Sequence, residues 1–133
     1  MEYLIAHIGH TNKHHEHVTW WKPNSMGYTI CIEKAGRYAA EEAASICRYG
    51  QCIAVRVQDV VEPLARSTPH YRLSNGTLGK LYDGGPHRPV PNSRGCWDAL
   101  MKLRTYPPQA EKVEKPTPIG AKARAIYVDG VLA

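Results

Sequence analysis

The sequence predicts an α+β fold, a small and mostly antiparallel sheet with two helices packed on it. Three observations predict it. Short segments rich in strand-forming residues recur along the chain, two segments carry apolar residues at helical spacing, and an Asn-Gly pair between apolar segments is typical of a β-hairpin. A chain of 133 residues is close to the usual size of one domain and can bury a core without a metal or a disulfide.

The first strands are predicted near the N-terminus. Residues 1–8 (MEYLIAHI) are rich in strand formers and end at Gly9, which favours a central strand. Residues 17–21 (HVTWW) and 27–33 (GYTICIE) form two further strands, and the polar turn KPNSM joins them. These two strands therefore make a hairpin.

A helix and a buried strand follow. Residues 37–50 (RYAAEEAASICRYG) repeat small or apolar residues at helical spacing, with Glu41 and Glu42 near the positive N-terminal end of the helix and Arg48 near its negative C-terminal end. Residues 52–61 (CIAVRVQDVV) have the composition of a buried strand.

The second half adds a hairpin and a second helix. Asn75-Gly76 lies between apolar residues on both sides, the strongest short hairpin signal in the chain. A Gly- and Pro-rich loop follows. Asn92 or Ser93 then precedes residues 95–104 (GCWDALMKLR), which carry apolar residues on one helical face, so either residue is a candidate N-cap.

Composition divides the chain into three parts. Residues 1–105 form a single α+β domain. Residues 106–120 hold four prolines and almost no large apolar residues, which is typical of a linker. Residues 121–133 are expected to be a C-terminal strand or a tail.

Charge and hydropathy narrow the function classes. The formal net charge is +5 and the isoelectric point about 9.1, which favours encounter with phosphates or acidic protein surfaces, but no Lys/Arg block is present. No segment approaches the ~18 apolar residues of a membrane span, and the N-terminus lacks the pattern of an export signal. We expect a cytoplasmic protein without a membrane partner.

The four cysteines, Cys31, Cys47, Cys52 and Cys96, contain no C-x-x-C pair. Their spacing matches none of the usual zinc knuckles. In a reducing cytoplasm they are expected to be free thiols, and those on apolar faces are expected to be inert.

A histidine-rich segment occupies residues 7–17 (HIGHTNKHHEH). His-Ile-Gly-His is a candidate motif for nucleotidyl transfer, but that chemistry needs a helix directly after the second His. The residues that follow show no helical period. The imidazoles of the segment could supply ligands to Zn or Ni. These histidines are His7, His10, His14, His15 and His17. The sequence favours a solvated polar loop here, and we predict no metal or cofactor.

The best candidates for ligand binding surround the first hairpin. Adjacent residues on a strand face opposite sides, so one of the two neighbouring tryptophans is expected to be buried while the other is exposed beside basic residues, where it could stack a base and hold its phosphate. The alternative is that both rings pack in a core that lacks Phe. The predicted binding residues are Trp20, Trp21, Lys22, Tyr28, Thr29, Arg37 and Tyr38.

Residues 18–60 resemble small accessory proteins of phages and prophages that carry a W-W-x-P-x-x-x-G-Y-T, A-G-x-Y, E-E-A arrangement. The resemblance implies a mobile-element gene product that works in the cytoplasm of a bacterial host. Similar proteins often have Ser or Thr directly after A-G-x-Y, where it caps the helix. This chain has Ala39 there, which costs about 1 kcal/mol of capping.

The basic, aromatic surface around the first hairpin favours a non-enzymatic binding protein. The resemblance implies that it counteracts a host defence, by occluding a defence protein or by sequestering a nucleotide or nucleic acid. Two alternatives remain open: an enzyme that modifies a nucleotide or nucleic acid through the histidine-rich segment, and a phage assembly protein. A homo-oligomer is compatible with the sequence.

Overall fold

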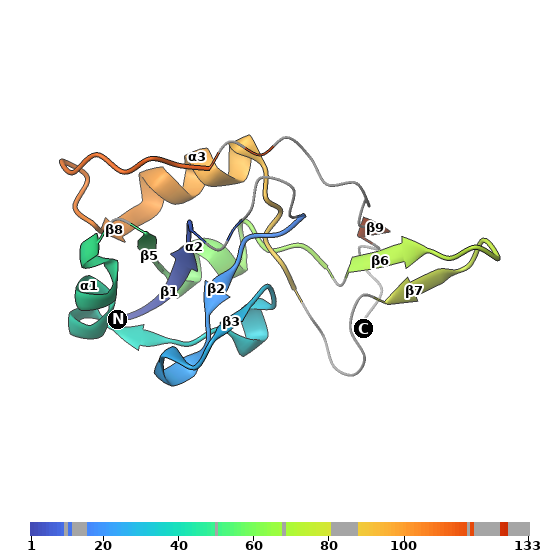
Figure 1. Ribbon diagram of the computed structural model, residues 1–133, viewed down its shortest axis with the longest axis horizontal. Coiled ribbons are helices and arrows are strands. Elements are labelled where there is room, and N and C mark those ends of the chain that lie inside the picture. The colour runs from blue at the N-terminus through green and yellow to red at the C-terminus, as the bar shows by residue number, and fades with distance from the viewer. Residues whose placement is uncertain are drawn as a thin grey trace.

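The computed structural model describes residues 1–9, 11, 16–49, 51–67, 69–80, 88–116, 118 and 126–127. Within these ranges, the chain forms β-strands, α-helices and short 3₁₀ helices (Figure 1). In chain order they are β1 (Glu2–His7), β2 (Trp20–Trp21), β3 (Tyr28–Thr29), β4 (Tyr38–Ala39), α1 (Ala40–Ile46), β5 (Cys52–Arg56), α2 (Val57–Val61), β6 (Pro69–Arg72), β7 (Leu78–Lys80), α3 (Arg94–Leu103), β8 (Arg104–Tyr106) and β9 (Ile126–Tyr127). Short 3₁₀ helices cover Pro23–Ser25, Ile32–Lys34 and Cys47–Tyr49.

The main sheet is antiparallel in all its described pairings and runs in the order β3-β2-β1-β5-β8. The strand β4 pairs with the start of β1, at Glu2 and Tyr3, whereas β2 pairs with its end, at Ala6. The two short strands therefore share one side of β1, and β5 occupies the other. As predicted, the first strand is central.

The two faces of the main sheet are buried against different helices. Leu4 and Ala6 of β1 belong to a cluster that includes Trp97 and Leu100 of α3 and a residue of α2. The intervening residues of β1 belong to a second cluster with Ala43 of α1. Because successive side chains of a strand point to opposite faces, this alternation gives the sheet α2 and α3 on one side and α1 on the other.

A smaller sheet lies beside this body, in the order β7-β6-β9 (Figure 1). Its hairpin turns at Gly76, whose φ of 87° is in the left-handed region that glycine adopts without strain. The predicted Asn-Gly hairpin is therefore confirmed. Ile126 and Tyr127 pair with the other edge of β6, so residues near the C-terminus return to this sheet.

The predicted α+β class and mostly antiparallel sheet are confirmed, and the structure adds a third, short helix. Residues 52–61 were expected to be one strand, but β5 ends at Arg56 and Val57–Val61 form α2. In α2 the buried residue is Val60, whose side chain packs in the core cluster on one face of the helix. A short apolar run fits either state, and packing against the sheet decided between them.

The strand expected at residues 27–33 is also shorter than predicted. The pairing with β2 ends at Thr29, and Ile32–Lys34 form a 3₁₀ helix. The backbone N–H of Ile32 donates to the carbonyl of Arg88 at 2.9 Å, so this residue bonds to a segment far along the chain and not to β2. Ile32 is buried in the core cluster by this turn.

Two hydrogen bonds of the Tyr38 hydroxyl stabilise the turn of the first hairpin. Its hydroxyl donates to the carbonyl of Lys22 and accepts from the N–H of Ser25 at 3.0 Å. A Cβ at Gly36 would come within 3.0 Å of the backbone of Pro23, so this approach needs glycine. The proline, glycine and tyrosine of the W-W-x-P and A-G-x-Y pattern therefore all serve the geometry of one turn.

Arg104 organises the chain that follows the last helix. It is buried, and its guanidinium donates to the carbonyls of Pro107 at 3.1 Å, Pro108 at 3.2 Å and Glu111. The side chain of Gln109 in turn donates to the carbonyl of Met101 at 3.0 Å, at the end of α3. Residues 107–111, within the segment of linker-like composition, thus lie against Arg104.

Candidate functional site: an aromatic cluster at the end of the first strand

Three aromatic side chains meet on the α1 side of the main sheet. The rings of Trp21 and Tyr28 have centroids 4.6 Å apart, and the imidazole of His7 stands edge-on to both, at 5.6 Å from Trp21 and 5.1 Å from Tyr28. All three residues are half-buried. We call His7, Trp21 and Tyr28 the aromatic cluster.

The sheet register assembles the aromatic cluster. Trp21 pairs with Tyr28 across the β2–β3 hairpin, which places their side chains on the same face. The last residue of β1, His7, pairs with Cys52 of β5 on that face. Three strands therefore contribute one ring each, and the ring positions are fixed by backbone pairing.

Cys52 lies beneath the aromatic cluster. The indole Nε1 of Trp21 donates to its Sγ at 3.2 Å, which fixes the orientation of the indole ring. Burial raises the pKa of the Cys52 thiol, and the hydrogen bond from Trp21 offsets part of that effect. The thiol is therefore protonated at neutral pH and supports the ring without acting as a nucleophile.

The two tryptophans lie on opposite faces of the sheet, as predicted, but Trp21 packs against the second core cluster and is not fully exposed. Trp20 is completely buried in the core with α2 and α3, whereas Trp21 is half-buried on the opposite face. Tyr38 is buried and serves the hairpin turn through Lys22. Thr29 lies on the Trp20 side of the hairpin, and its hydroxyl accepts from the N–H of Cys31. Of the seven predicted binding residues, the structure brings Trp21 and Tyr28 into contact.

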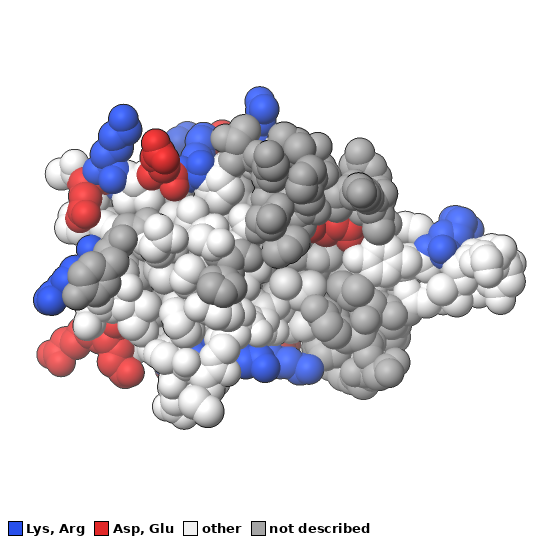
Figure 2. Space-filling view, in the orientation of Figure 1, with Lys and Arg blue, Asp and Glu red and all other residues white. Residues whose placement is uncertain are grey.

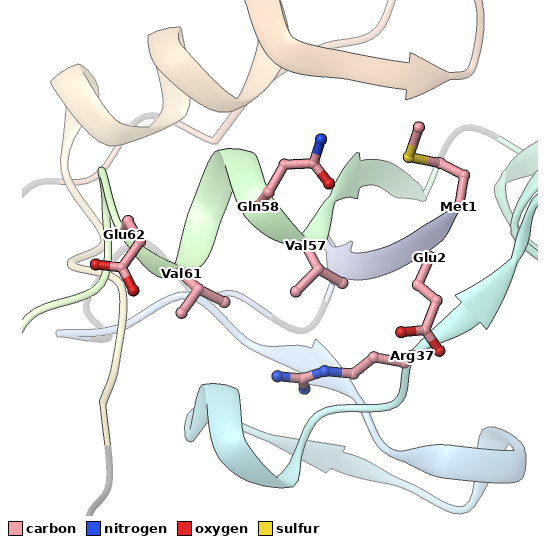
Figure 3. Close-up of a pocket in the computed structure, with 7 residues that line it drawn as sticks. All are labelled: Met1, Glu2, Arg37, Val57, Gln58, Val61 and Glu62. Atoms are coloured by element: carbon pink, nitrogen blue, oxygen red, sulfur yellow. The ribbon is translucent and has the colours of Figure 1, made fainter.

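Arg37 lies elsewhere, in a depression of about 640 Å³ beside α2 (Figure 3). Its Nη1 donates to the carbonyls of Ile32 at 2.6 Å and Ala35 at 2.7 Å. Figure 3 shows Val57 and Val61 projecting from α2 on the Arg37 side. The remaining lining residues are Met1, Glu2, Gln58 and Glu62. The depression lies on the α2 side of the sheet, so Arg37 cannot hold the phosphate of a base stacked on Trp21.

The sequence pattern assigns His7 to the histidine-rich segment, and the structure places it in the aromatic cluster. The alternation of buried residues in β1 could have placed it, because His7 follows Tyr3 and Ile5 on the face opposite Leu4 and Ala6. Its partners Trp21 and Tyr28 could not be found in this way, since only the pairing of β1 with its neighbours brings them together.

The histidine-rich segment is only partly described. His10, His14 and His15 lie outside the described residues. The two described members take part in different contacts: His7 joins the aromatic cluster, and His17 is buried against Tyr127. Among the described residues, no three side chains of His, Cys, Asp or Glu gather in a geometry that could hold a metal ion.

The surface around these sites has mixed charge. On the face shown in Figure 2, the Lys and Arg side chains of the described residues are separated from one another, and Asp and Glu lie among them. Within the described ranges, none of the helices combines the length and apolar character needed to cross a bilayer.

In comparisons with known proteins, no family model, no curated protein and no solved structure matches this chain.

Proposed function

We propose that this chain is a phage or prophage binding protein that acts stoichiometrically in the cytoplasm of a bacterial host, and that it sequesters a nucleotide or single-stranded nucleic acid by stacking a base on the aromatic cluster. One observation carries the proposal: three half-buried rings on three strands are held in mutual contact at the surface of the sheet. The purpose of such binding would be to counteract a host defence.

The ring geometry favours a flat ligand over a cationic one. An aromatic cage for an ammonium group needs a space between its walls, whereas the centroids of Trp21 and Tyr28 are only 4.6 Å apart and their planes are tilted by 41°. A ligand must therefore lie on the outer surface of the rings. Nucleobases stack on such surfaces with little dependence on sequence.

Three of the four cysteine thiols are poorly suited to covalent catalysis. Burial raises the pKa values of Cys31, Cys47 and Cys52, so the nucleophilic thiolate is scarce at neutral pH.

The proposal is tested by isothermal titration calorimetry with three probes: a single-stranded oligonucleotide, a mononucleotide and a cyclic dinucleotide. Stacking on aromatic rings contributes about 1 to 3 kcal/mol per base, so Trp21→Ala and Tyr28→Ala are each expected to weaken binding roughly 5- to 150-fold. Calorimetry is preferable to fluorescence, because Trp21→Ala removes the partly exposed tryptophan that would report binding.

Tyr106→Ala is the matched control. Tyr106 is a half-buried aromatic residue on the same face of the sheet, and its ring contacts Tyr3 at 5.5 Å, away from the aromatic cluster. This variant should keep the affinity of the native chain. If none of the three probes binds, or if Tyr106→Ala weakens binding as much as Trp21→Ala in proteins with equal thermal stability, the cluster is not a base-stacking site.

A further inference from the structure

Two neighbouring residues hold the small sheet on the body of the protein. The hydroxyl of Tyr71 in β6 donates to Oε2 of Glu16 at 2.6 Å. The hydroxyl of Tyr127 in β9 and Nε2 of His17 form a hydrogen bond of 2.8 Å, in which the imidazole tautomer decides which group donates. We call Glu16, His17, Tyr71 and Tyr127 the clamp.

The clamp is anchored in the body through its backbone. The N–H of Asn92 donates to the carbonyl of Glu16 at 2.8 Å, and His17 pairs with Pro91 in an isolated antiparallel bridge. The N–H of Val18 donates to the carbonyl of Val90 at 2.9 Å. Residues 16–18 are therefore fixed on the body, and the two tyrosines are the groups that they hold.

His17 is 3% exposed, so a charge on its imidazole would lie away from water. Its described ionisable partner is Tyr127; around Tyr127 lie the carboxylate of Glu16, which accepts from Tyr71, the guanidinium of Arg66, 4.4 Å from the ring centroid, and the thiol of Cys96. Residues 89–92, against which His17 pairs, contain no ionisable side chain. Glu16 already accepts the Tyr71 hydroxyl, and Arg66 adds a positive charge across the Tyr127 ring.

We propose that His17 makes the clamp acid-sensitive: protonation of its imidazole releases the small sheet, β7-β6-β9, from the main sheet while the core around Trp20 and Trp97 stays folded. Both tryptophans are completely buried and lie in the cluster between the main sheet and α3, which does not depend on the clamp tyrosines. The small sheet is joined to the body through the polar groups of the clamp, and Pro69 of β6 is also buried there.

The sign of the effect follows from the burial of His17. Burial lowers its pKa from the ordinary value of 6.5 to about 4 in the closed clamp. Burial also raises the pKa of Tyr127 to about 12, so its hydroxyl stays protonated throughout. In the open clamp His17 meets water and regains its ordinary pKa. The open state therefore binds the proton first as the pH falls through 6.5, and opening becomes more favourable until the pH reaches about 4.

The effect of pH on the opening of the clamp can be measured by hydrogen exchange. With those two pKa values, the equilibrium constant for opening should rise roughly 30-fold between pH 7.5 and pH 5. Protection factors, which correct for the intrinsic pH dependence of exchange, should fall by that factor for amides of β6 and β9, while amides of β1 and β5 keep theirs. Direct NMR titration of the His17 ring should give a pKa well below 6.5.

Matched variants separate His17 from other causes. His17→Gln cannot take up a proton and should abolish the pH-dependent fall, whereas His70→Gln removes another histidine from β6 itself and should leave the fall intact. Tyr127→Phe removes one bond of the clamp without replacing His17, so it should lower the protection of β6 and β9 already at pH 7.5. A fall that persists in His17→Gln, an equal fall at β1 and β5, or a His17 ring that titrates near 6.5 would each overturn the proposal.

Discussion

Trp97 donates a hydrogen bond of 2.6 Å from its Nε1 to Oδ1 of Asn92, and both residues are buried. The bond ties the first turns of α3 to the segment that pairs with His17. Trp20 offers a direct contrast, because its buried Nε1 has no hydrogen-bond partner among the described residues. The two large core indoles therefore differ in one polar interaction.

This difference predicts that replacement by Phe lowers the free energy of unfolding by unequal amounts at the two tryptophans. Trp97→Phe and Trp20→Phe remove the same atoms, but only the first breaks a buried hydrogen bond and deprives Asn92 of a donor. We expect Trp97→Phe to lower the free energy of unfolding by about 1 to 2 kcal/mol more than Trp20→Phe does. Urea unfolding measures both. Equal costs, or a larger cost at Trp20, would contradict the prediction.

The helix N-caps give a second prediction. Ser93 caps α3 by accepting from the N–H of Cys96 at 3.2 Å, whereas Ala39 stands at the N-cap of α1 and forms no side-chain cap bond. Ala39 has φ −70° and ψ 160°, which suits a cap residue, and Glu42 lies three residues later as in a capping box. Ala39→Ser should raise the free energy of unfolding by about 0.5 to 2 kcal/mol, and Ser93→Ala should lower it by a similar amount.

Ala44→Ser is the control for the gain at residue 39, because it adds the same hydroxyl inside α1. A serine in the helix interior is expected to be neutral or slightly destabilising. The interpretation of residue 39 as an empty cap position fails if Ala39→Ser does not raise stability above that of Ala44→Ser.

Arg104 is expected to be sensitive even to a conservative replacement. Lysine keeps the charge but cannot reach several carbonyls in the forked geometry of a guanidinium. Arg104→Lys should therefore lower the free energy of unfolding by about 2 to 4 kcal/mol, measured by chemical denaturation. Arg56→Lys, at the exposed end of β5, should have little effect. Similar costs for the two variants would show that the carbonyl contacts contribute little.

The four free cysteines should react in a fixed order with iodoacetamide. Cys96 is half-buried and should be modified first, whereas Cys31, Cys47 and Cys52 are buried with raised pKa values. Because the thiolate is the reactive form, these three should label only slowly at pH 7.5. Peptide mass spectrometry at short times gives the order, and labelling in urea should modify all four. Rapid labelling of Cys47 in the folded protein would contradict the described burial.

Local signals in the sequence were enough for several elements. Asn75-Gly76 predicted its hairpin, and Ser93, one of the two predicted candidates, is the N-cap of α3. The position of the first strand at the centre of the sheet was also predicted, from its content of strand-forming residues. These features depend on turn chemistry, capping and burial, which act over a few residues.

The limits of other elements needed tertiary contacts. Val57–Val61 form a helix because this conformation packs Val60 in the core. Ile32 does not pair in the hairpin because its N–H donates to the carbonyl of Arg88. Arg104 was expected to be the last residue of the second helix, but it lies in β8 and donates to the carbonyls of the following turn. Each change depends on a partner that sequence spacing does not identify.

By itself, the sequence determined the α+β class and the placement of Trp20 and Trp21 on opposite faces of the sheet, since two adjacent strand residues must face opposite sides. Only the tertiary structure decided which groups share a site. The register of β1 brought His7 to Trp21 and Tyr28, and the same sheet placed Arg37 on the other side. The clamp likewise joins His17 to Tyr127, residues 110 positions apart, because β9 returns to β6.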